Sequence, residues 1–426
     1  MLSNLFRNCN KDLKKFLTVK TAFSRRRKLT ISHVIGQILH TAANQNGTGY
    51  AISSQNYGHE LKSALLSRFK PVAASTFCEA RRKVSYEALE HLLKKANSEN
   101  TGQLRWKKHN VRAIDSTKLT LPNSRELNEA FSFPKGGGGA IGYYPQGVLI
   151  TAKNILTGQP TAARLVQHMG SKEKEAVLDF AKSFNAGDVC VLDRGFHDMK
   201  FWNELTKMEL HYVVRYKVGR GDSEEIARLR KSVRRSLIVT RQIKDGAGNT
   251  VNIKFRVIRG RRDKEGNLLF VATNLLDEKT YSNKSILKLY NDRWTVETLF
   301  DRLKNLSKLE NFRARNINGI MQEIFAHLLL LSMTALLAMK TSVDDQVFPV
   351  FKAVLHILKR HLPWILHSKQ SKNLARLLRR MWKDSQLLRY KKRPNRSYPR
   401  VSKQPSGKWN FAKADKLKKF MQKNAS

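Results

Sequence analysis

The spacing of apolar residues divides the chain into helical and strand-forming stretches. Up to about residue 105, apolar residues recur every three or four positions, as in ELKSALLSRF and STFCEARRKVSYEALEHLLKKA, which predicts amphipathic helices. The break KPVAA separates these two segments. A helix, a tight turn and a second helix carrying Arg81, Arg82 and Lys83 fit a DNA-binding helix-turn-helix, and they fit an ordinary helical hairpin equally well.

Between about residues 106 and 217 the pattern shortens to the period of β-strands. The predicted strands are NVRAIDSTKLTLP, GVLITAKNIL, PTAARLVQHM, DVCVLDRGF and HYVVRYKV. The first is expected to end at Asp115 and the fourth at Asp193. KEKEAVLDFAKSF and MKFWNELTKM have helical spacing and flank the fourth strand. The order of three strands, helix, strand, helix and strand describes a mixed α/β sheet covered by helices.

Residues 218–275 alternate apolar and polar side chains, with turn signals at Asp245–Gly246 and Glu265–Gly266, which predicts a β-rich insertion. Helical spacing then returns. The segment from Ile324 to Met339, IFAHLLLLSMTALLAM, is apolar enough to suggest a membrane span. It is slightly short for one and contains His327, so we expect a buried core helix and no membrane partner.

These changes of pattern give five regions. They are a basic helical DNA-binding region (1–105), the first part of a catalytic domain (106–217), the β-rich insertion (218–275), the completion of the catalytic domain (276–345), and a helical C-terminal region with a basic tail (346–426). From Ser368 onward the only acids are Asp384 and Asp415. We expect this tail to be partly disordered until it meets nucleic acid.

The net charge narrows the class of partner. The 426 residues contain 80 Lys plus Arg against 34 Asp plus Glu, giving a net charge of +46. Such a charge opposes compaction unless a polyanion neutralises it, which favours a nucleic-acid partner over a merely solubilising role. The three cysteines, Cys9, Cys78 and Cys190, form no CxxC pair. A disulfide framework or zinc site is therefore not expected, and a reducing cytoplasm fits.

One short run concentrates groups suited to phosphate chemistry. In LYNDRWTVETLFDRLKNL the residues Tyr290, Arg293, Glu297 and Lys304 follow the spacing Y-x2-R-x3-E-x6-K. On one continuous helix they fall within roughly 60° of arc. That stripe presents a carboxylate between cations and a phenol, while Val296, Leu299, Leu303 and Leu306 form the opposite apolar face. The alternative is that Glu297 has no role in catalysis and only forms an ion pair with Arg293 on a solvated helix surface.

Two aspartates share a setting that suits metal ions. Asp115 and Asp193 each follow a short apolar run, VRAI and VCVL, and precede a turn. Ligands of open α/β sheets gather at the carboxyl ends of strands, although a single strand-end Asp is more often a turn residue. Glu297 could complete the site from its helix. Three carboxylates in a polyanion-binding chain suggest phosphodiester chemistry assisted by two Mg²⁺ ions.

Two neighbours of these residues are weaker candidates for DNA contact. Arg194 directly follows Asp193 and either binds a phosphate or caps a turn. Trp294 either stacks on a flipped base or packs into the core, and its position beside the apolar face favours the core.

The three blocks AIDST around Asp115, LDRGF around Asp193, and YNDRWTVETLFDRLK from Tyr290 to Lys304 resemble those of a DDE transposase from a bacterial insertion sequence. The resemblance is to the subgroup with the Tyr–Arg–Glu–Lys signature, which also inserts a β domain before the Glu. It spans roughly residues 58 to 340 and covers neither the first 50 residues nor the tail.

This resemblance implies a fold and a chemistry. The fold would be ribonuclease-H-like: a mixed α/β sheet with helices, a β-rich insertion before the helix of the catalytic Glu, and a helical N-terminal DNA-binding region. Asp115, Asp193 and Glu297 would hold two Mg²⁺ ions, with Mn²⁺ able to substitute, while Tyr290, Arg293 and Lys304 would orient DNA. The family cuts DNA at the element ends and joins the freed 3′ hydroxyl to a target by in-line attacks on phosphorus.

The resemblance also implies partners and a location. The partners would be double-stranded DNA, both terminal inverted repeats and target, and a second copy of the chain in a synaptic complex. The location would be the bacterial cytoplasm, in association with the nucleoid. Two alternatives stay open at this point. One is a metal-dependent nuclease without strand transfer, and the other is a non-catalytic DNA-binding protein.

Overall fold

The structure is a computed structural model. It describes residues 5–6, 9–24, 29–44, 49–63, 70–98, 104–135, 141–167, 171–218, 224–246, 248–262, 266, 268–341, 347–367 and 371–391. The basic tail beyond Lys391 lies outside these residues.

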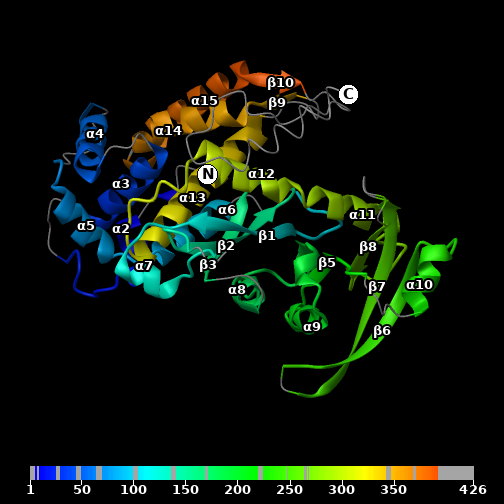
Figure 1. The fold of residues 1–426 in the computed structure, drawn as a ribbon. Helices are drawn as coiled ribbons and strands as arrows, with labels where there is room; N and C mark the ends of the chain where they lie inside the picture. The colour runs from blue at the N-terminus through cyan, green and yellow to red at the C-terminus, as the bar shows by residue number, and fades with distance from the viewer. Residues whose placement is uncertain are drawn as a thin grey trace, which may run out of the picture.

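A mixed sheet forms the centre of the described chain (Figure 1). Its eight described strands lie in the order β3-β2-β1-β4-β5-β8-β7-β6. They are β1 (Val111–Thr120), β2 (Gln146–Asn154), β3 (Pro160–Val166), β4 (Val189–Leu192), β5 (His211–Arg215), β6 (Ser236–Lys244), β7 (Thr250–Arg262) and β8 (Leu268–Thr273).

The first five strands form a ribonuclease-H-like sheet. β3, β2 and β1 run antiparallel to one another, and β1, β4 and β5 run parallel. The short parallel strands β4 and β5 are buried on both faces, which is why VCVL and YVV read as continuous apolar runs. Helices α8 (Ser171–Ala181) and α9 (Met199–Lys207) supply the connections that return the chain to parallel strands. The mixed α/β fold class expected from the sequence is confirmed.

The β-rich stretch extends this same sheet. β8 pairs antiparallel with β5, and β7 and β6 follow as a long hairpin. In Figure 1 this hairpin, with α10 (Glu224–Lys231) beside it, projects away from the helical part of the molecule. The extension therefore begins at β5. This strand is the neighbour of β4, and Asp193 directly follows β4.

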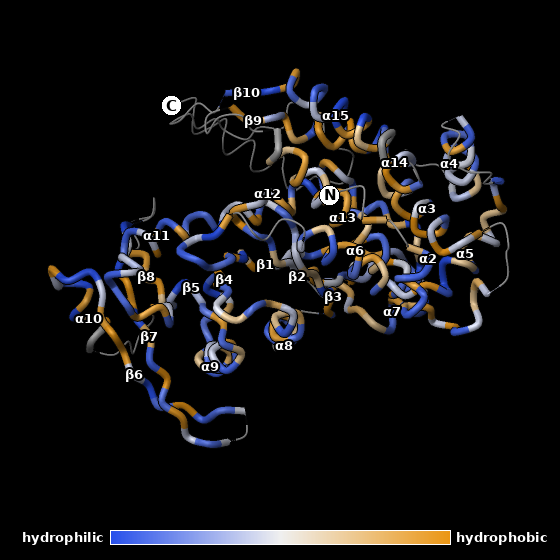
Figure 2. The backbone as a smooth tube through the Cα atoms, turned by 180° about the vertical axis from the view of Figure 1, so that it is seen from behind, coloured by the Kyte–Doolittle hydropathy of each residue, from blue (hydrophilic) through white to orange (hydrophobic). Residues whose placement is uncertain are grey.

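Helices pack around the long helix α13 (Ile317–Thr341). The main ones are α3 (Ile31–Ala43), α4 (Tyr50–Ser63), α5 (Ala74–Arg82), α6 (Glu87–Ser98), α14 (Phe351–His367) and α15 (Ser371–Leu387). Shorter elements are α2 (Cys9–Asp12), η1 (Lys14–Phe16), α7 (Arg125–Ala130), η3 (Arg194–Phe196), β9 (Val347–Pro349) and β10 (Arg389–Lys391). Figure 2 shows the hydrophobic residues of α13 running through this helical part.

Helix α13 is the apolar segment that suggests a membrane span. Residues Ile317–Met339 are long and apolar enough to cross a membrane, and the 18-residue window that meets this test is entirely buried within the protein. Its leucines pack against α3, α6 and α14. The expectation of a buried core helix is confirmed, because neighbouring helices and strand β3 cover the segment.

The N-terminal helices are fixed to α13 by a buried ion pair. Arg81, 6% exposed, donates from Nη1 to Glu323 Oε1 at 3.0 Å and from Nη2 to the Gly319 carbonyl at 2.7 Å. Its Nε donates to Gln322. The single helix expected over STFCEARRKVSYEALEHLLKKA is in fact two, α5 and α6, separated at residues 83–86. Arg81 is thus a structural residue and cannot reach DNA from this position, whereas Arg82 is exposed.

Candidate active site

Asp115 lies within β1. The expectation that this strand ends at Asp115 is wrong, because residues Ser116–Thr120 continue to pair with Gln146–Ile150 of β2. The parallel partner on the other side does stop: β4 ends at Leu192. At Asp115, β1 therefore has no strand partner on the β4 side but is still paired with β2 on the other.

The register of β1 and β4 brings the two aspartates together. Val111 pairs with Val189 and Ala113 with Val191. Continued by two residues, this register sets Asp115 beside Asp193, and adjacent strands lie about 4.8 Å apart. Burial raises the pKa of Asp115, and the charge of Asp193 raises it further. The backbone N–H of Ser116 and the Arg293 guanidinium oppose this shift.

Both carboxylates have defined partners. Asp115 Oδ1 accepts from the Ser116 N–H at 2.8 Å, and its Oδ2 accepts from Arg293 Nη1 at 2.8 Å. Asp193 Oδ1 accepts from the Gly195 N–H at 2.9 Å and so caps the short helix η3. These bonds hold the two side chains at the sheet edge in fixed orientations.

The helix that carries the signature is interrupted. The expectation of one continuous helix is wrong: α11 (Asn283–Asp292) and α12 (Thr295–Asp301) are separated at Arg293–Trp294. Backbone bonds there run over three residues, with Arg293 N to Tyr290 O at 3.1 Å and Glu297 N to Trp294 O at 3.1 Å. After α12 the chain widens into a π-turn, η4 (Arg302–Leu306).

This tightening and widening of the helix redistributes the four signature residues, because an ideal 100° step no longer applies. Tyr290 and Arg293 point inward and are 5% and 7% exposed, whereas Glu297 is exposed. Lys304 is half-buried, and its Nζ donates to the Lys118 carbonyl at 2.5 Å. The apolar face keeps its predicted role, since Val296, Leu299 and Leu303 are buried.

Trp294 is 60% exposed. The expectation that it packs into the core is therefore wrong. The tightened turn directs the ring outward while Arg293, 5.8 Å from the ring centroid, turns inward to Asp115. An exposed indole beside a guanidinium is suited to stacking on a base.

The structure joins some of the predicted site residues and not others. Four of them, Asp115, Asp193, Arg293 and Tyr290, lie together at the carboxyl end of β4, in the interior of the sheet. Glu297 lies one turn beyond Arg293, on α12, which packs against β1 and β2. Within the described residues, no three His, Cys, Asp or Glu side chains are close enough to hold a metal ion. Asp115 and Asp193 supply two carboxylates, the kind of ligand that a hard divalent ion combines with waters and substrate phosphates.

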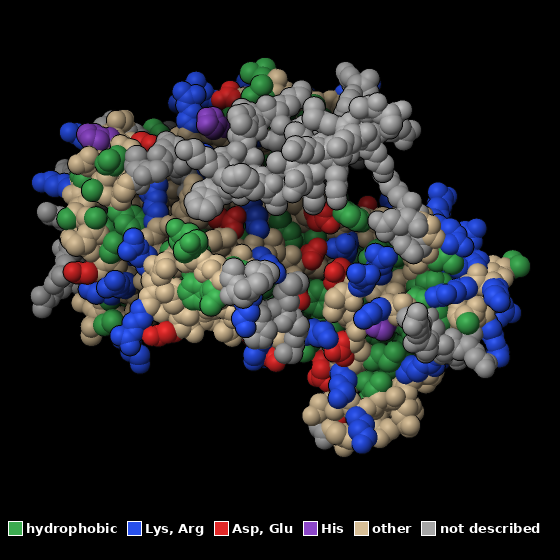
Figure 3. Space-filling view, viewed as in Figure 1, with side chains coloured by type: hydrophobic (Ala, Val, Ile, Leu, Met, Phe, Trp, Pro, Cys, Tyr) green, Lys and Arg blue, Asp and Glu red, His purple; other side chains and the backbone are tan. Residues whose placement is uncertain are grey.

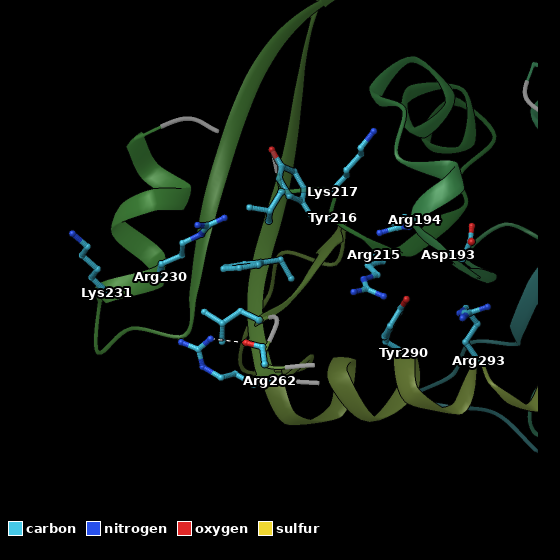
Figure 4. A pocket seen from close by; sticks show the side chains of 14 residues that line it. Asp193, Arg194, Arg215, Tyr216, Lys217, Arg230, Lys231, Arg262, Tyr290 and Arg293 are labelled. Carbon is cyan, nitrogen blue, oxygen red and sulfur yellow. Dashed lines mark hydrogen bonds between the residues drawn. The ribbon is translucent and has the colours of Figure 1, made fainter. Parts of the chain in front are cut away.

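A cationic cavity opens beside Asp193 (Figure 4). Its volume is about 840 Å³. Besides Asp193, Tyr290 and Arg293 its lining includes Arg194, Arg215, Tyr216, Lys217, Arg230, Lys231 and Arg262. These cations come from η3, from β5 and the residues just after it, from α10 and from β7, so the cavity lies between Asp193 and the β-rich extension. In Figure 3, Lys and Arg side chains gather over the part of the molecule that carries this extension.

Most of these cations were not singled out from the sequence. In HYVVRYKV, Arg215 ends a buried strand in the same way that Asp193 follows one, and strand-end position was a usable signal. Arg230, Lys231 and Arg262 offered no such signal. They reach the cavity only because β7 and β8 pair back onto β5.

The fold and this edge define an enzyme of phosphodiester chemistry on a ribonuclease-H-like sheet. A family model for the transposase DDE domain matches residues 106–333, and the chain belongs to this family. It is a DDE-type transposase that acts in DNA transposition. Such enzymes depend on divalent metal ions.

Two further comparisons add little. No curated protein matches the chain. Among solved structures, a piggyBac transposase synaptic complex with hairpin DNA is similar at 12% identity and a TM-score of 0.46, over 96% of this chain and 87% of that one.

Proposed function

We propose that Asp115, Asp193 and Glu297 form the metal-binding site of this transposase and that its ions are Mg²⁺, replaceable by Mn²⁺. The observation that carries this proposal is the β1–β4 register, which aligns Asp115 with Asp193 at the edge where β4 ends. When bound, a pair of ions would activate the attacking oxygen and stabilise the leaving one. Glu297 would complete the site from the first turn of α12.

The neighbouring residues then orient DNA. The planar guanidinium of Arg293 has the donors to bind a phosphate through two parallel hydrogen bonds once it releases Asp115. Tyr290 lies on the wall of the cationic cavity, and Arg194 is exposed at its rim. Lys304 donates to the Lys118 carbonyl of β1 and can turn to a phosphate. Trp294 offers a face for an unstacked base.

The reaction has two balanced steps. Water attacks the phosphodiester that joins the 3′ end of the element to the flanking DNA. The P–O3′ bond breaks, the phosphate stays on the flanking strand, and a proton passes to the O3′ of the element. The freed 3′ hydroxyl of the element then attacks a target phosphodiester, so one P–O bond forms as another breaks. Both displacements need the same stabilisation of charge on phosphorus, which lets one site serve both.

Finer features follow the resemblance to the Tyr–Arg–Glu–Lys subgroup. We propose that the element is a bacterial insertion sequence and that the protein works in the cytoplasm near the nucleoid. Two copies would pair the terminal inverted repeats before cutting. Residues 1–105 would bind the end sequence, 106–217 and 276–345 would form the catalytic domain around the insertion 218–275, and 346–426 would add basic contacts.

Cleavage of paired ends in the presence of a target plasmid tests the site. Asp115→Ala, Asp193→Ala and Glu297→Ala should each abolish cutting and joining while end binding stays largely intact. Asp301→Asn is the matched control, because Asp301 lies one turn beyond Glu297 and is exposed. Full excision by any of the three variants would show that the assignment is wrong. Products cut but never joined would instead indicate a nuclease.

A further inference from the structure

Lys153 is a buried lysine next to the site. The reaction scheme above gives this lysine no role. It lies on β2 and is 4% exposed. In the part of the chain that the structure describes, no carboxylate pairs with it. Burial, with a smaller contribution from the charge of Arg302, lowers the pKa of Lys153 to about 7. Burying an amine destabilises the folded state unless its N–H groups donate hydrogen bonds.

The amine is satisfied by helix α12. Lys153 Nζ donates to the Thr295 carbonyl at 2.7 Å and contacts Thr298 Oγ1 at 3.3 Å. Thr298 Oγ1 in turn donates to the same Thr295 carbonyl at 2.5 Å. These two threonines flank Glu297, so the lysine grips the helical turn that carries this carboxylate.

The same strand face also carries Asp115. On β1, Ala113 is opposite Lys153, and Asp115 is opposite Thr151. Residues two apart on a strand point to one side, and directly paired residues share a face. Lys153 and Asp115 therefore both project toward α12. One side chain contacts its first turn, and the other contacts Arg293 just before that turn.

This turn is where the helix lacks regular support. Bonds over three residues run from Arg293 to Glu297, and such stretches inside helices often mark hinges. Without an external tie, the turn could rotate about the break. The lysine supplies the tie from the rigid centre of the sheet.

We propose that Lys153 is a positioning residue, which holds the first turn of α12 against β2 and thereby fixes Glu297 relative to Asp115. The inference rests on the proposed function for the role of Glu297, but the tether itself does not. Lys153 does not contact substrate in this scheme and acts only through the helix.

Hydrogen exchange of the full-length protein tests the tether without any catalysis. In Lys153→Met, which keeps the length of the stem but lacks the donors, exchange of the amides in residues 295–301 should be about tenfold faster. Exchange in α8, on the opposite face of the sheet, should not change. Val148→Ala is the control, because Val148 is buried on the same strand but faces the other core cluster. Unchanged exchange in α12 would overturn the proposal.

Cleavage of an end at saturating DNA and Mg²⁺ tests the consequence. Lys153→Met should lower the cleavage rate at least tenfold and leave the Kd for end DNA within twofold. Thr298→Val should slow cleavage less, and the double variant should be no slower than Lys153→Met. Cleavage by Lys153→Met within twofold of the wild-type rate would refute the positioning role.

The two readouts separate the possible failures. If Glu297→Gln cuts at full rate, the assignment of the carboxylates fails, and the exchange result still decides whether the tether exists. If Lys153→Met does not fold, Thr298→Val carries both tests, because Thr298 is exposed and its replacement leaves the core intact. In that case, unchanged exchange and unchanged cleavage in Thr298→Val would overturn the proposal.

Discussion

Arg293 Nη1 lies 2.8 Å from Asp115 Oδ2, and this ion pair links the break between α11 and α12 to strand β1. The Arg293 side chain is 9% exposed and the Asp115 side chain 18%. Arg293 thus balances a carboxylate whose pKa burial has raised.

Removing this cation should destabilise the fold through Asp115. We expect Arg293→Gln to lower the free energy of unfolding in urea by about 2 kcal/mol at pH 7, because a half-buried carboxylate loses its partner. The raised pKa of Asp115 gives the sign of the pH dependence: the loss is present above that pKa and shrinks as pH falls through it, since the neutral acid needs no cation. Asp115→Asn with Arg293→Gln should recover at least half of the loss. Strictly additive effects would contradict this coupling.

Trp294 should contribute to DNA binding and little to stability. Because the ring is 60% exposed, Trp294→Ala should change the free energy of unfolding by less than about 0.5 kcal/mol. If it stacks on an unpaired base, the same change should weaken binding of a frayed element end by about 1–3 kcal/mol. Equilibrium binding to frayed and fully paired ends measures this difference. Equal losses on both DNAs would exclude base stacking.

Adjacent arginines at the end of α5 should behave oppositely. Arg81→Met breaks a buried ion pair and should cost about 3–5 kcal/mol of stability. Arg82→Gln, at an exposed position, should leave stability unchanged and weaken DNA binding only if this surface meets phosphate. Thermal unfolding and end binding on the same samples give both readouts. A stable Arg81→Met protein with poor DNA binding would reverse the assignment.

The sequence predicted the parts of the site that local pattern determines. Asp115 and Asp193 could be paired because each follows a short apolar run, and parallel strands of an α/β sheet end at a common edge. The apolar face of α12 was also readable from spacing alone. Sequence could not show that β1 continues past Asp115, since STKLT gains its strand character from pairing with β2.

The interrupted signature helix was equally invisible. No Pro or Gly stands between Asn283 and Leu306 to mark the break. At the tightened turn Arg293 donates to Asp115, and the Thr295 carbonyl accepts from Lys153. Both partners are distant in sequence, so tertiary contacts decided the geometry over local preference. The contact of Lys153 with α12 could not be predicted for the same reason. In the sequence, Lys153 has the pattern of a polar residue on an amphipathic strand.

Lys153 should give the protein a distinctive pH dependence. Its pKa falls from 10.5 to about 7 on folding. Between these values the unfolded chain binds the extra proton, so the contribution of Lys153 to stability rises with pH, by at most about 1.4 kcal/mol per unit. Below about pH 7 the contribution is constant. Urea unfolding of wild type and Lys153→Met from pH 6 to 9 should give a difference that is flat and then changes in favour of wild type. A flat difference throughout would mean that the amine stays charged.

The cationic cavity should account for part of the salt dependence of DNA binding. Each phosphate neutralised by Lys or Arg contributes about 0.9 to the slope of log affinity against log salt on duplex DNA. Lys231→Gln and Arg194→Gln remove cations from opposite sides of the cavity. Each substitution should therefore lower the slope by just under one, and the two together by about two. The affinity losses should be similar on unrelated DNA sequences, because phosphate contacts carry no base information.

Arg125→Gln is the matched control, since Arg125 is highly exposed, pairs with Glu129 and lies on α7, which contributes no residue to this cavity. Slopes unchanged from wild type in both cavity variants would show that DNA passes elsewhere, and that the cations of α10 and η3 serve a different anion.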